Sequence, residues 1–160
     1  MAIRMIRQEG DEILKKKSRP VEIIDDKIKE LIEDMVETMH QYNGVGLAAV
    51  QVGILKQIIV IDIYEEGTPI VKLINPKIIK QKGERELEEG CLSFPNKFAK
   101  VKRPTEVVVE GLNENGEKVK IKATELLAQA LCHEIDHLNG ITFVDRMEPG
   151  TLEYVDSQEK

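Results

Sequence analysis

The sequence of 160 residues contains no tryptophan, and aromatic residues make up only 4% of it. Cysteine is also scarce, with Cys91 and Cys132 as its two representatives. We expect no secretory signal, because residues 1–11 lack a contiguous hydrophobic segment. Reduced thiols are then the expected state, and any cysteine that matters is expected to have a metal-binding or catalytic role. These features together predict a cytoplasmic protein.

Long hydrophobic runs and an excess of basic residues are missing as well. No apolar stretch approaches the roughly 20 residues of a transmembrane helix, so we expect no membrane partner. The formal net charge of −6 argues against binding to DNA or to an anionic membrane surface, since either would require a basic footprint. The sequence has no internal repeat and no linker rich in Gly, Ser or Pro, and its length fits one domain.

The pattern of apolar residues predicts a helix on each side of a set of strands. Helical spacing runs over 20–42, with Asp25 or Asp26 as the N-cap, and a second helix is expected from about Thr124 to Asn139-Gly140. Runs rich in β-branched residues predict strands at 58–63, 70–79, 105–110 and 118–122, with a bend at Pro76 and a hairpin at 113–116. The segment 44–53 is predicted as a loop, and 88–95 as a segment flanked by turns. We therefore predict one α+β domain at 1–150, with antiparallel sheets around a central helix and an N-terminal helix, followed by a short acidic tail at 151–160.

The second helix carries the most informative motif, His133-Glu-Ile-Asp-His137, which holds two of the three histidines. A helix advances about 100° per residue, so the two imidazoles project within about 40° of each other and can hold one divalent metal. Glu134 lies at the edge of this site, where a base acting on metal-bound water belongs. The same spacing also occurs on ordinary amphipathic helices, so other segments must decide the function.

The same helix has two apolar faces. Leu131, Ile135 and Leu138 belong to the stripe that is expected to face the core. Leu126 and Ala130 lie instead on the face of the histidines. They could line a pocket for a hydrophobic substrate side chain beside the metal, or they could be further core, and the sequence leaves both interpretations open.

Two imidazoles do not make a durable metal site, so a third ligand is required. Cys132 projects about 100° away from His133, and we interpret it as a small buried hydrophobe. His40, near the end of the first helix, is interpreted as a partly exposed or helix-capping histidine. Cys91 is the favoured ligand, because it follows Gly90 in a segment whose backbone can hold a thiolate toward a helix.

Three segments together resemble the signature motifs of the peptide deformylases, in the family's order and with similar separations. They are Gly44-Val-Gly-Leu-Ala-Ala-Val-Gln51, Glu89-Gly-Cys-Leu-Ser93 and His133-Glu-Ile-Asp-His137. The resemblance extends from the first helix to about Met147. It implies a metal-dependent hydrolase that removes the N-formyl group from the N-terminal methionine of newly made proteins and releases formate. Its partners would be N-formyl-methionyl nascent peptides.

The resemblance also implies roles for individual residues. Metal ligation is implied for Cys91, His133 and His137, general acid and base catalysis for Glu134, and oxyanion stabilisation for the side chain of Gln51 and the backbone N–H of Leu92. Val45 and Gly46, with Leu126 and Ala130, are expected to line the substrate site. Glu89 and Arg103 are expected to pair and support the Cys91 segment, with an ordinary surface ion pair as the alternative. The implied cofactor is one divalent ion per chain, Fe(II) natively, with Zn, Ni or Co as replacements.

The sequence departs from the family's pattern at three places. Val50 stands where many members carry proline, and Phe98 where some members place a basic residue that meets the peptide's carboxylate. Residues 151–160 lack the long basic helix with which some members dock on the ribosome, so ribosome association is not carried over.

The main alternative function is a zinc peptidase of the His-Glu-x-x-His kind, which usually takes a histidine or acidic third ligand. Three further alternatives remain at this stage: a thiol hydrolase with Cys91 as nucleophile, a structural metal module with four protein ligands, and an inactive binding protein.

Overall fold

The computed structural model describes residues 2–155. In chain order its elements are the 3-10 helix η1 (Glu12–Lys15), α1 (Asp26–Gln41), β1 (Gly46–Ala48), the 3-10 helix η2 (Ala49–Val52), β2 (Ile58–Ile61), β3 (Val71–Lys82), β4 (Arg85–Cys91), β5 (Phe94–Arg103), β6 (Glu106–Leu112), β7 (Lys118–Thr124), α2 (Glu125–Leu138), α3 (Phe143–Arg146) and β8 (Glu153–Tyr154). None of the helices in this described part has the length and apolar character needed to cross a bilayer.

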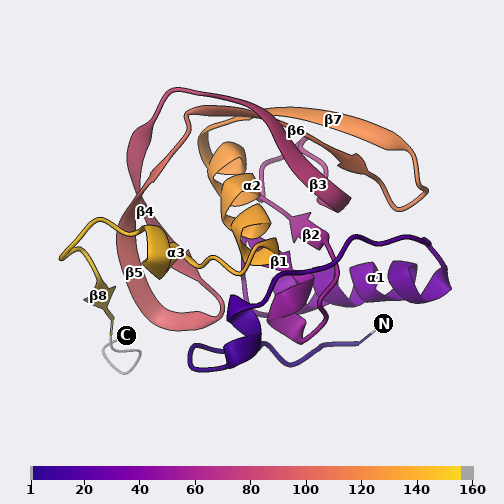
Figure 1. Cartoon of the computed structure of the whole chain (residues 1–160), viewed down its shortest axis with the longest axis horizontal. Coiled ribbons are helices and arrows are strands. Elements are labelled where there is room, and N and C mark those ends of the chain that lie inside the picture. Colours follow the sequence, from indigo (N-terminus) through magenta and orange to yellow (C-terminus); the bar gives the residue numbers. More distant parts are fainter. Residues whose placement is uncertain (1, 156–160) are drawn as a thin grey trace.

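The strands form two antiparallel sheets, one with the order β1-β2-β3-β6-β7 and one with the order β4-β5-β8. Figure 1 shows α2 in the middle, with β3, β6 and β7 curving over one end, β4 and β5 along one side, and α1 beyond β1 and β2. The predicted α+β fold, with antiparallel sheets around a central helix and a separate N-terminal helix, is therefore confirmed.

The central helix α2 is enclosed on nearly every side rather than along one stripe. Every residue from Ala130 to Leu138 is buried. Leu131 and Leu138 pack in a core cluster with the larger sheet, as predicted. On the other side, Phe143 of α3 packs with Phe94 of β5 in a separate cluster. Because both sides are covered, the polar side chains of α2 are held between the two sheets in an environment that excludes most water.

The first helix is shorter than its periodicity predicts. α1 begins at Asp26, and the carboxylate of Asp25 caps it by accepting a hydrogen bond from the Ile28 N–H at 3.0 Å. The predicted N-cap at Asp25 is therefore confirmed, whereas the helical structure that the spacing predicted at 20–25 is wrong. The side chain of Asn75 bonds both backbone groups of Val21, at 2.8 and 2.9 Å, and holds this segment out of the helix.

Two segments for which no helix or strand was predicted form regular structure, the loop-like 44–53 and the turn-flanked 88–95. Residues 44–53 contain β1 and η2, with Gly46 paired opposite Ile61 of β2. Residues 88–95 span the end of β4 and the start of β5, joined by a turn at 92–93. The apolar alternation of a strand is missing from β4 because its inward side carries Leu87 and the buried Glu89, while its outward side is charged.

The other predicted elements are confirmed with shifted ends. Pro76 lies at a register shift between Ile74 and Lys77 in β3, where a bend was expected. Gly140 follows α2 with a φ of 74°, the left-handed conformation that ends a helix. The short strand β8 was not predicted, and it pairs Glu153–Tyr154 with β5 within the expected tail. The rest of that tail, 156–160, lies outside the described residues.

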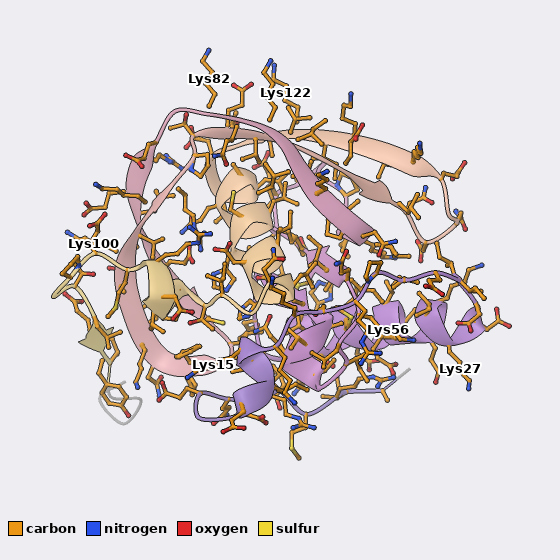
Figure 2. The ribbon with its side chains drawn as sticks, viewed as in Figure 1. Lys15, Lys27, Lys56, Lys82, Lys100 and Lys122 are labelled. Carbon is orange, nitrogen blue, oxygen red and sulfur yellow. The ribbon has the colours of Figure 1, made fainter. Side chains whose placement is uncertain are left out.

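The surface charges are spread rather than gathered. Lys27, Lys82 and Lys100 project outward at well-separated places (Figure 2). Lys122 lies 3.4 Å from a carboxylate oxygen of Glu106 on the neighbouring strand. This distribution agrees with the absence of a basic footprint in the sequence.

Candidate metal centre and active site

Three potential ligands converge where β4 passes α2. The Sγ of Cys91 and one ring nitrogen each of His133 and His137 all lie within 4.8 Å of one another. Cys91 Sγ is 3.3 Å from His137 Nε2. In a tetrahedral site with bonds of about 2.0 to 2.3 Å, ligand atoms lie about 3.3 to 3.6 Å apart, so the cluster is close to the spacing that one ion requires. A thiolate with two imidazoles also suits a divalent transition metal, so the donor set fits.

A buried carboxylate orients the first imidazole. Glu89 Oε2 lies 2.6 Å from His133 Nδ1, which leaves Nε2 to face the cluster. Arg103 donates to both oxygens of Glu89, at 3.0 and 2.6 Å. Glu89 and Arg103 are only 5% and 3% exposed, so the alternative of an ordinary surface ion pair is wrong.

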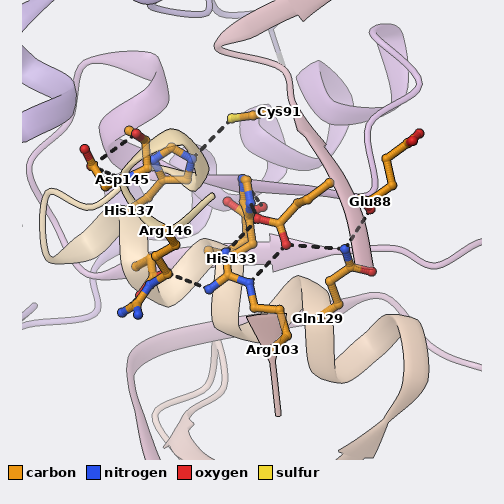
Figure 3. Close-up of polar contacts among 12 residues, drawn as sticks. Glu88, Cys91, Arg103, Gln129, His133, His137, Asp145 and Arg146 are labelled. Atoms are coloured by element: carbon orange, nitrogen blue, oxygen red, sulfur yellow. Dashed lines mark hydrogen bonds and ion pairs between the residues drawn. The ribbon is translucent and has the colours of Figure 1, made fainter. Parts of the chain in front are cut away.

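The same arginine continues the network to the C-terminal end of the fold (Figure 3). Arg103 Nη1 donates to Asp136 at 2.7 Å, and Arg146 of α3 binds both oxygens of Asp136, at 2.5 and 2.9 Å. Gln129 donates to Glu89 from the other side at 3.3 Å. Residues of β5 and α2 therefore bond the carboxylate that orients His133, and α3 supports them through Asp136.

Glu134 lies directly beside the ligand cluster. Its Oε2 is 3.8 Å from His133 Nε2, and its Oε1 is buried without a hydrogen-bond partner among residues 2–155. Gly46 makes room for it, since a Cβ at that position would lie 2.5 Å from Glu134 Oε2. The carboxylate therefore lies beside the cluster, and the described residues supply no hydrogen bond to one of its oxygens.

The side chain of Gln51 is fully buried and fixed at both ends. Its Oε1 accepts a hydrogen bond from the Ala48 N–H at 2.9 Å. Its Nε2 donates to Ser93 Oγ at 3.0 Å and points toward Cys91 Sγ at 3.5 Å. One amide hydrogen is therefore donated to Ser93, and the other is directed at the Cys91 sulfur of the cluster.

A cavity of about 690 Å³ opens beside the cluster. Its wall includes Val45, Gly46, Cys91, Leu92, Phe98, Leu126, Ala130, His133 and Glu134. Leu126 is 41% exposed, so the interpretation of this residue as core is wrong. Ala130 lines the cavity and also packs in the core cluster, so both interpretations hold for it. Gln51 and His137 approach the cluster from behind and do not line the cavity.

The two carboxylates of the site have opposite electrostatic environments. Burial raises the pKa of Glu134 to about 7, near the range in which it can both accept and return a proton. Burial also raises the pKa of Glu89, but hydrogen bonds from His133 and Arg103 outweigh this effect and lower the pKa to about 2. Glu89 therefore stays ionised as an acceptor.

The pKa values of the two imidazoles are also shifted in opposite directions. Burial lowers the pKa of His133, but the charges of Glu134 and Cys91 outweigh it and raise that pKa well above its usual range. Burial and the neighbouring His133 lower the pKa of His137 well below its usual range. The two environments therefore favour opposite forms, the protonated ring of His133 and the neutral ring of His137.

The two candidates rejected as ligands lie outside the cluster. Cys132 is buried with a pKa raised to about 11 by burial, as expected for a small inert hydrophobe. His40 is exposed at the end of α1, and its Nε2 lies 2.8 Å from Asp62 Oδ2.

Comparison with known proteins decides between the enzyme classes. The family model described as "Polypeptide deformylase" matches residues 3–153. The chain belongs to the peptide deformylase family. It is 54% identical to a peptide deformylase of Acetivibrio thermocellus over 99% of this chain and 89% of the relative. Family members remove the N-formyl group from nascent peptides, and this chain is an enzyme of that class, so the zinc-peptidase alternative is set aside.

Solved structures of the family share the fold. The crystal structure of the Thermotoga maritima peptide deformylase matches with a TM-score of 0.87 and 41% identity, covering 92% of this chain and 99% of that one. The enzyme from Synechococcus elongatus, solved in complex with actinonin, matches with a TM-score of 0.87 and 44% identity, covering 91% and 80%. The described part of this chain is thus the deformylase fold with a possible Cys/His/His metal site.

Several contributors to the site were missed from the sequence. Ser93 and Asp136 lie inside the motifs, so their position was a usable signal. Gln129 and Arg146 carry no such signal, because only the packing of α2 and α3 against β4 and β5 brings them near Glu89 and Asp136.

Proposed function

We propose that this chain removes the formyl group at the Cys91, His133 and His137 cluster, with Glu134, Gln51 and Leu92 acting on the substrate. The observation that supports it most is the convergence of those three ligand atoms within 4.8 Å beside a buried carboxylate and an open cavity. The catalytic domain is assigned to 1–150 and the acidic tail to 151–160.

The three ligands would hold one divalent ion, natively Fe(II), with Zn, Ni or Co as replacements. When bound, such an ion supplies Lewis acidity and lowers the pKa of a water molecule. Glu89 has the supporting role of keeping the Nδ1 of His133 engaged, so that the other nitrogen faces the ion.

Glu134 acts as general base and then as general acid. Its carboxylate takes a proton from the attacking water as the water oxygen bonds to the formyl carbon. It then gives that proton to the amine nitrogen as the carbon–nitrogen bond breaks, which releases formate and a free amine. A pKa of about 7 suits both steps, because the carboxylate can be found in either state near neutral pH.

Gln51 and Leu92 stabilise the negative oxygen that forms on the formyl carbon. The amide Nε2 of Gln51 has one hydrogen held by Ser93 and the other directed toward the cluster. Leu92 lies in the tight turn between β4 and β5 on the cavity wall, where its backbone N–H can serve as the second donor. In comparable enzymes one such donor is worth about 3 kcal/mol.

The peptide would bind between β1 and β4. β1 is the edge strand of its sheet, and the cavity is lined by Val45 and Gly46 as well as by Glu88–Gly90 of β4. An extended peptide can add to such an edge through backbone hydrogen bonds, whatever its sequence. Leu126 and Ala130 would receive the first side chain, which for a nascent protein is methionine.

Release of formate from formyl-Met-Ala-Ser, compared with cleavage of unformylated peptides, tests this function. We expect activity to disappear on chelation and to return with Fe(II). A thiol hydrolase would instead survive the chelator. Glu134→Ala should keep its metal and lose most turnover, and near wild-type turnover in this variant would refute the acid and base assignment.

We also propose that the protein works in the cytoplasm on nascent chains, with no DNA or membrane partner.

A further inference from the structure

A strained tyrosine stands behind the wall of the substrate cavity. Tyr64 has a φ of 56°, a left-handed conformation that is uncommon for any residue other than glycine and costs on the order of 1 kcal/mol or more. The hydroxyl of Tyr64 donates a hydrogen bond of 2.7 Å to the backbone carbonyl of Gly44. Gly44 lies at the start of the segment 44–46, which lines the cavity.

This hydrogen bond lies just beyond the end of the β1–β2 ladder. The last ladder pair joins Gly46 to Ile61, and the next bond runs from the Asp62 N–H to the Val45 carbonyl at 2.8 Å. The left-handed turn at Tyr64 then carries the chain away from β1. The hydroxyl of Tyr64 bonds the carbonyl of Gly44, which lies beyond the reach of the backbone hydrogen bonds from β2.

Asp62 fixes the tyrosine in this position. Its Oδ1 accepts the Tyr64 N–H at 2.8 Å, while its Oδ2 contacts His40 Nε2 at 2.8 Å. The rings of His40 and Tyr64 lie with centroids 5.8 Å apart. Burial and the charge of Asp62 raise the pKa of Tyr64, so the hydroxyl remains a donor at neutral pH.

The held segment touches catalytic groups on both sides. A Cβ at Gly44 would lie 2.5 Å from Leu92 Cδ1, and one at Gly46 would lie 2.5 Å from Glu134 Oε2. These gaps leave little room, so a shift of residues 44–46 changes the width of the cavity at the place where the peptide backbone would lie.

We infer that Tyr64 is a positioning residue, which holds the 44–46 wall at the spacing that a peptide substrate requires. The inference rests on the proposed function, since it assumes that the substrate binds along this wall. Tyr64 does not line the cavity itself and acts only through Gly44.

The test compares Tyr64→Phe, Tyr64→Asn and the control Tyr154→Phe in metal-loaded protein. Formate release from formyl-Met-Ala-Ser gives kcat and KM, and thermal unfolding gives Tm. Loss of one hydrogen bond should raise KM about fivefold in Tyr64→Phe, with kcat within about twofold of the unsubstituted protein. Tyr64→Asn should raise KM similarly while its Tm stays level or rises, because asparagine tolerates the left-handed backbone. Tyr154 is exposed on β8, and its substitution should change neither constant.

KM values within twofold of the unsubstituted protein in both Tyr64 variants would overturn the inference. So would a joint fall of Tm and kcat with KM unchanged, which would assign the tyrosine to turn stability alone. If the unsubstituted protein released no formate, the proposed function would fail instead. Calorimetric affinities for the same peptide would then decide whether Tyr64 shapes the site.

Discussion

The glycine opposite the catalytic carboxylate gives the sharpest prediction. In Gly46→Ala the new Cβ would lie 2.5 Å from Glu134 Oε2, 2.9 Å from its Cγ and 3.0 Å from its Cδ. Ordinary contacts begin at 3.4 Å, so the carboxylate must move by about 0.9 Å. Gly46 does not have a positive φ, so the backbone itself accepts alanine and the effect comes from the contact alone.

The expected cost follows from that displacement. Glu134 is only 3% exposed, so it moves against packed neighbours and cannot swing out into solvent. A misplacement of about 1 Å costs about 100-fold in rate, which corresponds to about 2.7 kcal/mol in activation free energy. Overpacking should also lower the free energy of unfolding by about 1 to 3 kcal/mol. Metal content should stay near one ion per chain, because the three atoms nearest to the added methyl all belong to Glu134 and not to a ligand.

A double-mutant cycle tests the reasoning. The rate constant kcat for formate release is measured for Gly46→Ala, Glu134→Ala and the combined variant, each with its metal content. If the alanine acts through the carboxylate, it should change kcat by less than about twofold in the Glu134→Ala background. A further 100-fold loss in that background would refute the argument and would assign the effect to the peptide-binding edge of β1.

Three other predictions concern the groups around the cluster. Cys91→Ser should weaken metal retention and favour harder ions, as measured by elemental analysis after dialysis, and unchanged metal content would point to another third ligand. Arg103→Met should lower the free energy of unfolding by about 3 to 5 kcal/mol in denaturant titrations, since it removes the buried guanidinium that pairs with Glu89 and Asp136, and a loss below 1 kcal/mol would contradict the burial argument. In metal-free protein at pH 8, iodoacetamide should label Cys91 and spare Cys132, whose thiol is buried with a pKa of about 11. Mass spectrometry of the peptides measures the labelling, and modification of Cys132 with Cys91 unmodified would contradict the prediction.

The sequence was most informative where local chemistry and local geometry coincide. The spacing of His133 and His137 is a property of one helix, so the facing imidazoles of α2 could be predicted without knowledge of the fold. The ends of α2 could be predicted for the same reason, because Asn139 and Gly140 stop a helix by their own conformational preferences. The convergence of Cys91 needed more, since β4 lies far from α2 in the sequence; its place after Gly90 made it the favoured ligand, and the motif resemblance implied the same role.

The sequence was least informative where a tertiary partner replaces a local preference. β4 was missed because its buried side contains Glu89, whose charge is compensated by Arg103 of the next strand. A pattern search for apolar alternation cannot recognise a strand whose inward residue is an ion. The residues before the first helix were misjudged in the same way. Asn75 of β3 bonds the backbone of Val21 and keeps this segment out of the helix.

The network of buried ions around His133 costs free energy, and its contact with His133 explains why this fold contains it. Burying charges costs more than packing apolar groups of the same size, so Glu89, Arg103 and Asp136 are not explained by stability alone. With Arg146, the two arginines and two carboxylates sum to zero charge. The network can therefore orient the Nδ1 of His133 without adding net charge beside the metal ligands. An apolar replacement would fill the same space, but it would leave the imidazole free to rotate, and the ligand atom would no longer be fixed toward Cys91 and His137.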